Sequence, residues 1–193
     1  MTPLLLLFGA LVVFTAIAAY TDLRTGLIPN RLLAAGFVVA LPLHAAVHFL
    51  VLRAPQDPSS EVLLQALGYY AAGVGGCGLV PFVLFRYKAM GGGDVKLLAM
   101  VGAFVGPIVG LEIQLYALVM AALFAGARLA YQGRLLRLLA NSVALVTNPI
   151  RPKSRRREVP QELMTSLRFA PAVFVAALLL TGMRLGMSRM ALA

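Results

Sequence analysis

Residues 3–20 are PLLLLFGALVVFTAIAAY, a run without a charged side chain. A helix needs roughly 20 mostly apolar residues to cross a bilayer, so this segment has the length and character of a membrane span. The polar stretch TDLRTGLIPNR follows at 21–31. A signal peptide would have basic residues before the apolar run and a small-residue cleavage site after it, and this segment has neither. We therefore expect a helix that is retained in the membrane.

The rest of the chain is equally apolar. Of its 193 residues 61% are hydrophobic and 12% are charged, whereas a soluble domain carries about a quarter charged residues. This composition excludes a soluble globular domain and a disordered chain. Further apolar segments lie at 32–52, 62–85, 95–111, 112–130 and 169–187. We predict an all-α integral membrane protein, a bundle of about six transmembrane helices in a single domain over 1–193, with a tight hairpin near Gly110 and Glu112.

The positive charges predict the orientation. The chain has 17 Lys and Arg against 7 Asp and Glu, and with both termini outside only Arg53, Arg184 and Arg189 fall on the outer side. Cytoplasmic segments of membrane proteins are rich in Lys and Arg, so we expect an N-out, C-out protein. Residues 131–168 form the largest basic segment, expected as a cytoplasmic loop with a short interfacial helix on anionic lipid; an alternative is that it recognises a protein partner. No nucleic-acid partner is expected.

Two carboxylates stand at the predicted cytoplasmic membrane boundary. Asp22 follows the first apolar segment, and Asp94 ends the run MGGGD at 90–94 and opens the fourth. Two carboxylates brought together can share a proton, so that one deprotonates a water while the other protonates a peptide carbonyl. Such a pair would hydrolyse an amide without a metal. The alternative is a flexible glycine turn with Asp94 as a helix N-cap.

Two longer motifs sharpen this interpretation. Asp22-x-Arg24-x-x-x-Ile28-Pro29-Asn30 follows the first span, and Gly91-x-Gly93-Asp94-x-Lys96 follows the third. Together they resemble the type IV prepilin peptidase family, membrane aspartic proteases of the GxGD type. The resemblance implies that Asp22 and Asp94 are catalytic, that no cofactor is needed, and that the reaction removes the short basic leader of prepilins or pseudopilins. It also implies a bacterial inner-membrane protein with its active site facing the cytoplasm.

The chain resembles the short members of that family. It begins directly with a span and has one cysteine, Cys77, whereas the larger members carry a methyltransferase domain with paired cysteines. The short form is most similar to the peptidases of tight-adherence (Tad/Flp-type) pilus systems. Archaeal preflagellin peptidases are similar in size and are kept as an alternative.

The other motif residues are expected to shape the site or bind substrate. They are Gly91, Gly93, Arg24, Lys96, Pro29 and Asn30. Glycines allow close approach of a substrate strand, and Asn30 is a candidate N-cap of the second helix. Lys96 and Arg24 have a simpler interpretation as cations at the membrane boundary.

Helix dipoles suggest a division of labour between the carboxylates. Asp94 opens a helix, where a negative charge is favoured, and Asp22 is expected just past the end of one, where it is not. The hypothesis is that Asp94 activates the water and Asp22 carries the proton. Arg24 argues against it, because a cation near Asp22 favours the charged carboxylate.

Two other classes of function compete with a peptidase. Ionisable groups in membrane helices often mark ion paths, as in a proton-coupled transporter, and the small-residue segments would suit a non-catalytic assembly subunit of a pilus or secretion system. His44 and His48 lie one helical turn apart, but no third ligand accompanies them and no metal site is expected. Cys77 lies among glycines, which indicates close helix packing.

Overall fold

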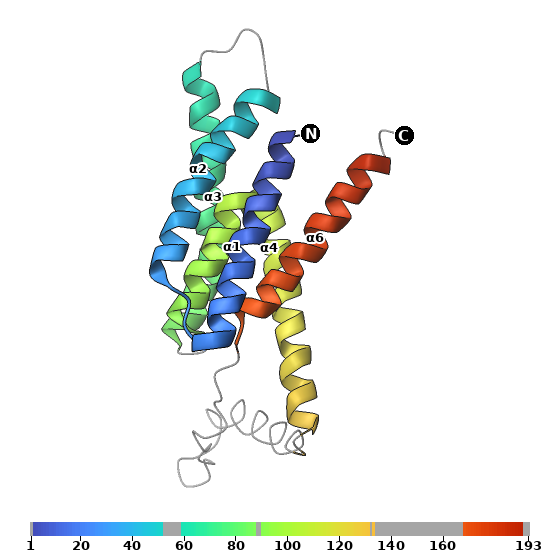
Figure 1. Ribbon diagram of the computed structural model, residues 1–193. Coiled ribbons are helices and arrows are strands. Elements are labelled where there is room, and N and C mark those ends of the chain that lie inside the picture. Colours follow the sequence, from blue (N-terminus) through green and yellow to red (C-terminus); the bar gives the residue numbers. More distant parts are fainter. Residues whose placement is uncertain (1, 52–58, 88–89, 132, 134–167, 191–193) are drawn as a thin grey trace, which may run out of the picture. The chain divides into compact units, whose positions relative to one another are not determined.

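The chain folds into helices in every element that the structure describes. The computed structural model describes residues 2–51, 59–87, 90–131, 133 and 168–190. They form α1 (Thr2–Thr25), α2 (Asn30–Val51), α3 (Ser59–Arg86), α4 (Gly92–Tyr131) and α6 (Ala170–Met190), and no strand lies in these ranges (Figure 1). The predicted all-α class is confirmed.

Four of the described helices are long and apolar enough to cross a membrane. The stretches are Leu5–Thr25, Asn30–Val47, Leu63–Arg86 and Gly92–Arg128, whereas α6 has a shorter apolar stretch, Ala170–Arg184. The protein is therefore a helical membrane protein. The count of about six spans and the N-out, C-out orientation stay predictions.

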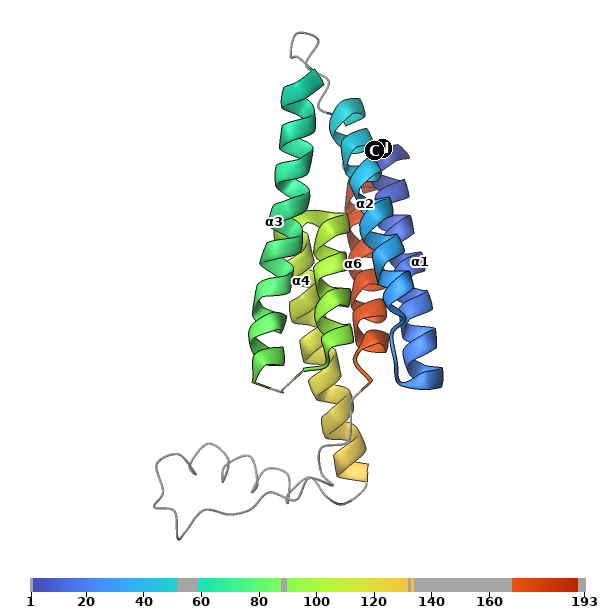
Figure 2. The same cartoon turned by 90° about the vertical axis from the view of Figure 1, so that its left-hand side faces the viewer.

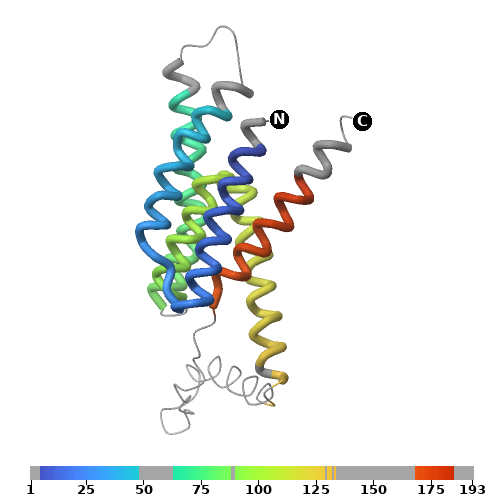
Figure 3. The backbone as a smooth tube through the Cα atoms, viewed as in Figure 1, coloured from blue at the N-terminus to red at the C-terminus, as the bar shows by residue number. Residues whose placement is uncertain are grey.

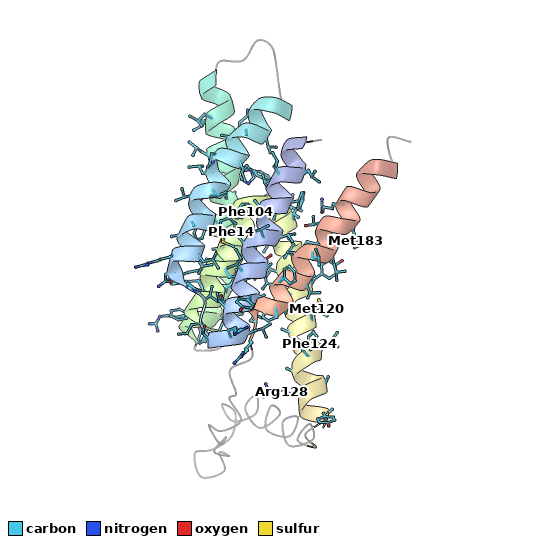
Figure 4. The ribbon with its side chains drawn as sticks, in the orientation of Figure 1. Phe14, Phe104, Met120, Phe124, Arg128 and Met183 are labelled. Atoms are coloured by element: carbon cyan, nitrogen blue, oxygen red, sulfur yellow. The ribbon has the colours of Figure 1, made fainter. Side chains whose placement is uncertain are left out.

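The chain divides into two compact units. The first comprises Met1–Leu118 and Arg168–Ala193, and the second comprises Val119–Leu167. The second unit is described through 119–131, the last turns of α4, which carry the exposed side chains of Leu123 and Phe124 and also Met120 and Arg128 (Figure 4). The predicted basic loop at 131–168 lies outside the described residues except at its ends.

Within the first unit, α4 reverses direction at Gly106. This residue is non-helical, with φ 75° and ψ −179°. Residues 102 and 110 would lie about 12 Å apart in a straight helix. Instead, a Cβ placed on Gly110 would lie 3.0 Å from the Cα of Gly102, so two antiparallel arms meet there, as Figures 2 and 3 show. Pro107 lacks the N–H that would continue the helix, and glycine readily takes the positive φ before it.

The predicted hairpin near Gly110 and Glu112 is thus displaced to Gly106. Residues 97–111 contain no polar or charged side chain, so the hydrophobic pattern could not mark a turn within them. The dipeptide Gly106-Pro107 does mark the turn, because a Gly followed by Pro is a turn signal.

A glycine seam joins α3 to the two arms of α4. We use this name for Gly73, Cys77, Gly102, Gly106 and Gly110. A Cβ on Gly102 would overlap the carbonyl oxygen of Gly73 and lie 2.7 Å from the Cβ of Cys77. A Cβ on Gly110 would lie 2.5 Å from the Cys77 sulfur. The backbones approach as closely as small residues permit, which confirms that Cys77 belongs to a close packing surface.

The core of the first unit is formed by α1, the first arm of α4 and α6, whose fully buried side chains include Leu11, Phe104 and Val173. Phe14 and Phe104 face each other with ring centroids 5.6 Å apart (Figure 4). Leu97 of α4 is also fully buried. This packing brings the end of α1, the start of α2, the end of α3 and the starts of α4 and α6 to one end of the unit (Figures 1 and 2).

Candidate active site

Asp22 lies in the last turn of α1. The helix ends at Thr25 because Gly26 takes a positive φ of 70° and donates its N–H to the carbonyl of Asp22, 2.9 Å away. The side chain of Asp22 is 6% exposed. Its Oδ2 accepts a hydrogen bond from the backbone N–H of Ala170 at 3.3 Å. Asp22 is therefore inside α1, not just past its end as expected.

Asp94 is the third residue of α4. The carbonyl of Gly91 accepts a hydrogen bond from Val95 at 3.2 Å, so Gly91 occupies the N-cap position. The carboxylate of Asp94 accepts a hydrogen bond from the Gly91 backbone, as in a capping box. The alternative that Asp94 is itself the N-cap is wrong, because the helix starts two residues earlier at Gly92. Its side chain is half-buried.

The two carboxylates belong to the same end of the first unit. The charge of Asp22 acts on Asp94, so the pair is within electrostatic reach. Asp94 is half-open to the surroundings, whereas Asp22 is buried. We call this region, with Ala170, Asn30 and Lys96, the carboxylate end.

The dipole contrast between the two carboxylates is not found. Asp94 does lie in the first turn of its helix, where the positive end of the dipole favours a negative charge. Asp22 lies at the negative end of α1, but its Oδ2 also meets the first N–H of α6. Both carboxylates therefore accept a hydrogen bond from a helix start. The helix dipoles therefore do not distinguish whether Asp22 or Asp94 is the acid.

Lys96 joins α4 to α2. Its Nζ donates a hydrogen bond to Oδ1 of Asn30 over 2.9 Å. The carbonyl of Pro29 accepts the N–H of Leu33, so Pro29 holds the N-cap position of α2 and Asn30 is its first residue. Asn30 as N-cap is thus wrong, and its side chain serves the link to Lys96 instead. The two motifs are connected through these side chains.

The glycines before Asp94 differ in their surroundings. A Cβ on Gly91 would lie 3.1 Å from Oδ2 of Asp94, tighter than most real contacts. A Cβ on Gly93 would lie 3.6 Å from the Cβ of Ile28, an ordinary contact. Gly91 therefore leaves room for the carboxylate, and Gly93 packs beside the turn that precedes α2.

Arg24 points away from the carboxylates. Its guanidinium lies over the ring of Tyr20, 5.2 Å from the centroid, and both side chains are exposed. Residues two apart on a helix do not face each other, so Arg24 lies on a different face of α1 from Asp22. The position of Arg24 therefore gives no geometric argument against Asp22 as the carboxylate that carries the proton.

The described residues contain no group of three or more His, Cys, Asp or Glu side chains that could hold a metal ion. His44 is buried, with its ring edge-on to Tyr69 at 5.6 Å between centroids. The side chain of His48 lies outside the described part. Cys77 is buried in the glycine seam.

Two further contacts could not be foreseen from the sequence. One is the bond from Ala170 to Asp22, which involves a backbone N–H and so has no residue type that could signal it. The other is an ion pair between Arg184 of α6 and Glu112 of α4, with 2.7 Å between Nη2 and Oε2. Asp22 and Glu112 lie at the ends of apolar segments in the sequence, and no sequence pattern indicates that each contacts α6.

The comparisons with known proteins point to one family. The sequence model of the type IV leader peptidase family matches residues 9–128, a stretch that contains both Asp22 and Asp94. A search of the curated proteins found no match. A search of the solved structures found none either.

Proposed function

The chain belongs to the type IV leader peptidase family, and we propose that it is a membrane aspartic endopeptidase that removes the short basic leader from prepilins or pseudopilins. The observation that supports the proposal is that Asp22, in the last turn of α1, and Asp94, in the first turn of α4, come from distant parts of the sequence to the same end of the first unit (Figure 1). Each carboxylate accepts a backbone hydrogen bond, Asp22 from Ala170 and Asp94 from Gly91.

The proposed step is hydrolysis by an activated water. One carboxylate takes a proton from the water as the water oxygen attacks the scissile carbonyl carbon, and the other donates its proton to the carbonyl oxygen. The tetrahedral intermediate then returns one hydroxyl proton to the carboxylate that had donated its own, the C–N bond breaks, and the leaving amine takes the proton held by the other carboxyl group, which restores the starting pair. Asp22 and Asp94 act as one unit, so each can serve as acid and as base within the cycle.

The expected substrate suits a site at the end of the bundle. A prepilin has a basic leader outside the bilayer and an apolar helix within it, so its scissile bond lies at the headgroup level. We propose that the carboxylate end faces the cytoplasm at the bacterial inner membrane and that anionic lipid contacts the basic loop. The short form similar to Tad/Flp-type peptidases is the favoured group, and preflagellin processing is the alternative.

The test is a cleavage assay with defined variants. Purified protein in detergent is incubated with a prepilin, and mass spectrometry measures the shortened product. Asp22→Asn and Asp94→Asn should each lower kcat on the order of 10³-fold, because each removes one proton-transfer group. Glu61→Gln is the matched control: it also replaces a carboxylate by an amide, but at the start of α3, whereas the carboxylate end lies at the other end of that helix. This variant should cleave prepilin at the wild-type rate.

Two results would contradict the proposal. The first is a folded wild-type protein that cleaves no prepilin, which would favour a transporter or an assembly subunit. The second is wild-type cleavage by both Asn variants, since then the pair would have no part in the reaction. Circular dichroism of each variant establishes that its helices are intact.

A further inference from the structure

The start of α6 lies against the end of α1. The carbonyl of Phe169 accepts hydrogen bonds from Ala172 at 3.0 Å and from Val173 at 3.2 Å. Phe169 is therefore the N-cap of α6, and Ala170 is its first helical residue. The first N–H groups of a helix have no acceptor within that helix. The N–H of Ala170 finds one in Oδ2 of Asp22.

This hydrogen bond is buried within the first unit. Ala170 is fully buried and Asp22 is 6% exposed. A buried donor or acceptor that loses its partner bears the full desolvation penalty, so neither group can exchange this bond cheaply for one to water. The bond fixes one oxygen of the carboxylate and with it the plane of the group. The carboxylate cannot turn without leaving a buried N–H unpaired.

Asp22 and Asp94 are thus held in related ways. Asp94 accepts its bond from Gly91, three residues earlier, so its orientation is set within one helix start. Asp22 accepts its bond across 148 residues of sequence, from a different helix. Helices α1 and α6 pack against each other within the first unit, which brings the donor to the carboxylate.

We infer that the backbone N–H of Ala170 is a positioning group that holds the carboxylate of Asp22 toward Asp94, so that the pair is complete only when α6 is packed on α1. The inference rests on the proposed peptidase function. It assigns α6 a part in the reaction although the family match ends at residue 128.

A purely structural role is the competing explanation. An acidic side chain at a helix start stabilises that helix by capping, whether or not the acid takes part in chemistry. The two explanations differ in what a loss of the N–H changes. Capping alone predicts lower thermal stability with normal turnover, whereas positioning predicts slower turnover by a protein that still binds its substrate.

Ala170→Pro removes the N–H with little disturbance of the helix. Proline is well tolerated at the first helical position, and Pro171 already follows. We expect kcat for prepilin to fall roughly tenfold to a hundredfold, the size of one lost hydrogen bond to a charged group, with KM within about twofold. Ala170→Gly keeps the N–H and is the conservative comparison, expected to retain kcat within about threefold.

A second replacement guards against misfolding by the proline ring. Lactic acid incorporated at position 170 changes the amide to an ester, which replaces the N–H by oxygen and keeps the methyl group. The matched control reinserts alanine at the same codon. The ester protein should show the same loss of kcat as Ala170→Pro. Because the ring and the ester disturb the surroundings differently, agreement between them assigns the loss to the N–H.

Thermal unfolding reports on the bond independently of activity. Ala170→Pro should lower Tm in the wild-type background, and this shift should shrink when Asp22→Ala has already removed the acceptor. Folded Ala170→Pro and ester proteins with wild-type kcat would overturn the positioning role and leave the proposed function intact. A wild-type protein that cleaves no prepilin would overturn the proposed function and the positioning role with it, while the Tm comparison would still report the bond.

Discussion

The carboxylate end and the glycine seam hold helices together in opposite ways. At the carboxylate end, single hydrogen bonds join elements, as between Lys96 and Asn30 or between Ala170 and Asp22. In the seam, backbone meets backbone, with no space for a methyl group on Gly102. A hydrogen bond contributes about 0.5–1.5 kcal/mol net, whereas overpacking a tight contact costs about 1–3 kcal/mol or more.

The difference separates stability from activity along the molecule. Contacts that fix an orientation can be lost while the helices stay packed, because other contacts hold the backbone. Contacts that set the spacing between helices cannot be changed without moving a whole arm of α4. Substitutions in the seam should therefore act on folding, and substitutions at the carboxylate end should act on turnover.

The largest effect is expected in the seam. Gly102→Ala should lower the free energy of unfolding by about 3 kcal/mol, because its Cβ would overlap the carbonyl oxygen of Gly73 and crowd Cys77. Gly75→Ala is the matched control, since a Cβ there meets nothing within 4 Å. Thermal unfolding in detergent measures both. Equal Tm values for the two variants would show that the seam can widen at no cost.

A smaller effect, on activity alone, is expected at Gly91. Gly91→Ala would place a Cβ 3.1 Å from Oδ2 of Asp94 and push the carboxylate aside. Displacement of a reacting group by a fraction of an ångström should lower kcat roughly tenfold. The family motif treats Gly91 and Gly93 alike, but Gly93→Ala meets only an ordinary contact and should lose about threefold or less. The comparison fails if Gly93→Ala proves the slower of the two in prepilin cleavage.

A smaller effect than that of Gly91→Ala is expected from the link between α4 and α2. Lys96→Met removes an exposed hydrogen bond to Asn30 and should lower kcat about twofold to fivefold. The same substitution in an Asn30→Ala background should have little further effect, because the acceptor is already gone. A full second loss there would assign Lys96 a role that does not pass through Asn30.

The sequence predicted the helices well because their signal is long and redundant. Each apolar segment offers many positions that agree, so α1, α2, α3 and α6 match their predicted ranges apart from a few residues at the ends. The two arms of α4 were predicted too, but the turn between them was put four residues or more too late. Gly106 and Pro107 are apolar like their neighbours, so hydrophobicity alone could not mark the reversal.

The site was harder to predict because its contacts join distant segments. The motifs singled out Asp22 and Asp94, and the structure brings both to one end of the first unit. The motifs could not assign Asn30 to Lys96, since an Asn at a helix start is typical of a cap. They could not indicate Ala170 at all, because every residue but proline offers the same N–H.

The reversal at Gly106 also limits how far the first arm of α4 can reach. From Gly92 to Gly106 the arm is about 21 Å long at 1.5 Å per residue, while a hydrocarbon core is about 30 Å thick. An arm of this length that starts at one surface of the hydrocarbon core cannot reach the other surface. Its apex at Gly106 lies against the ring of Tyr69. Lipid beside this apex faces a hydrophobic mismatch, and we expect the membrane to be locally thinned around the protein.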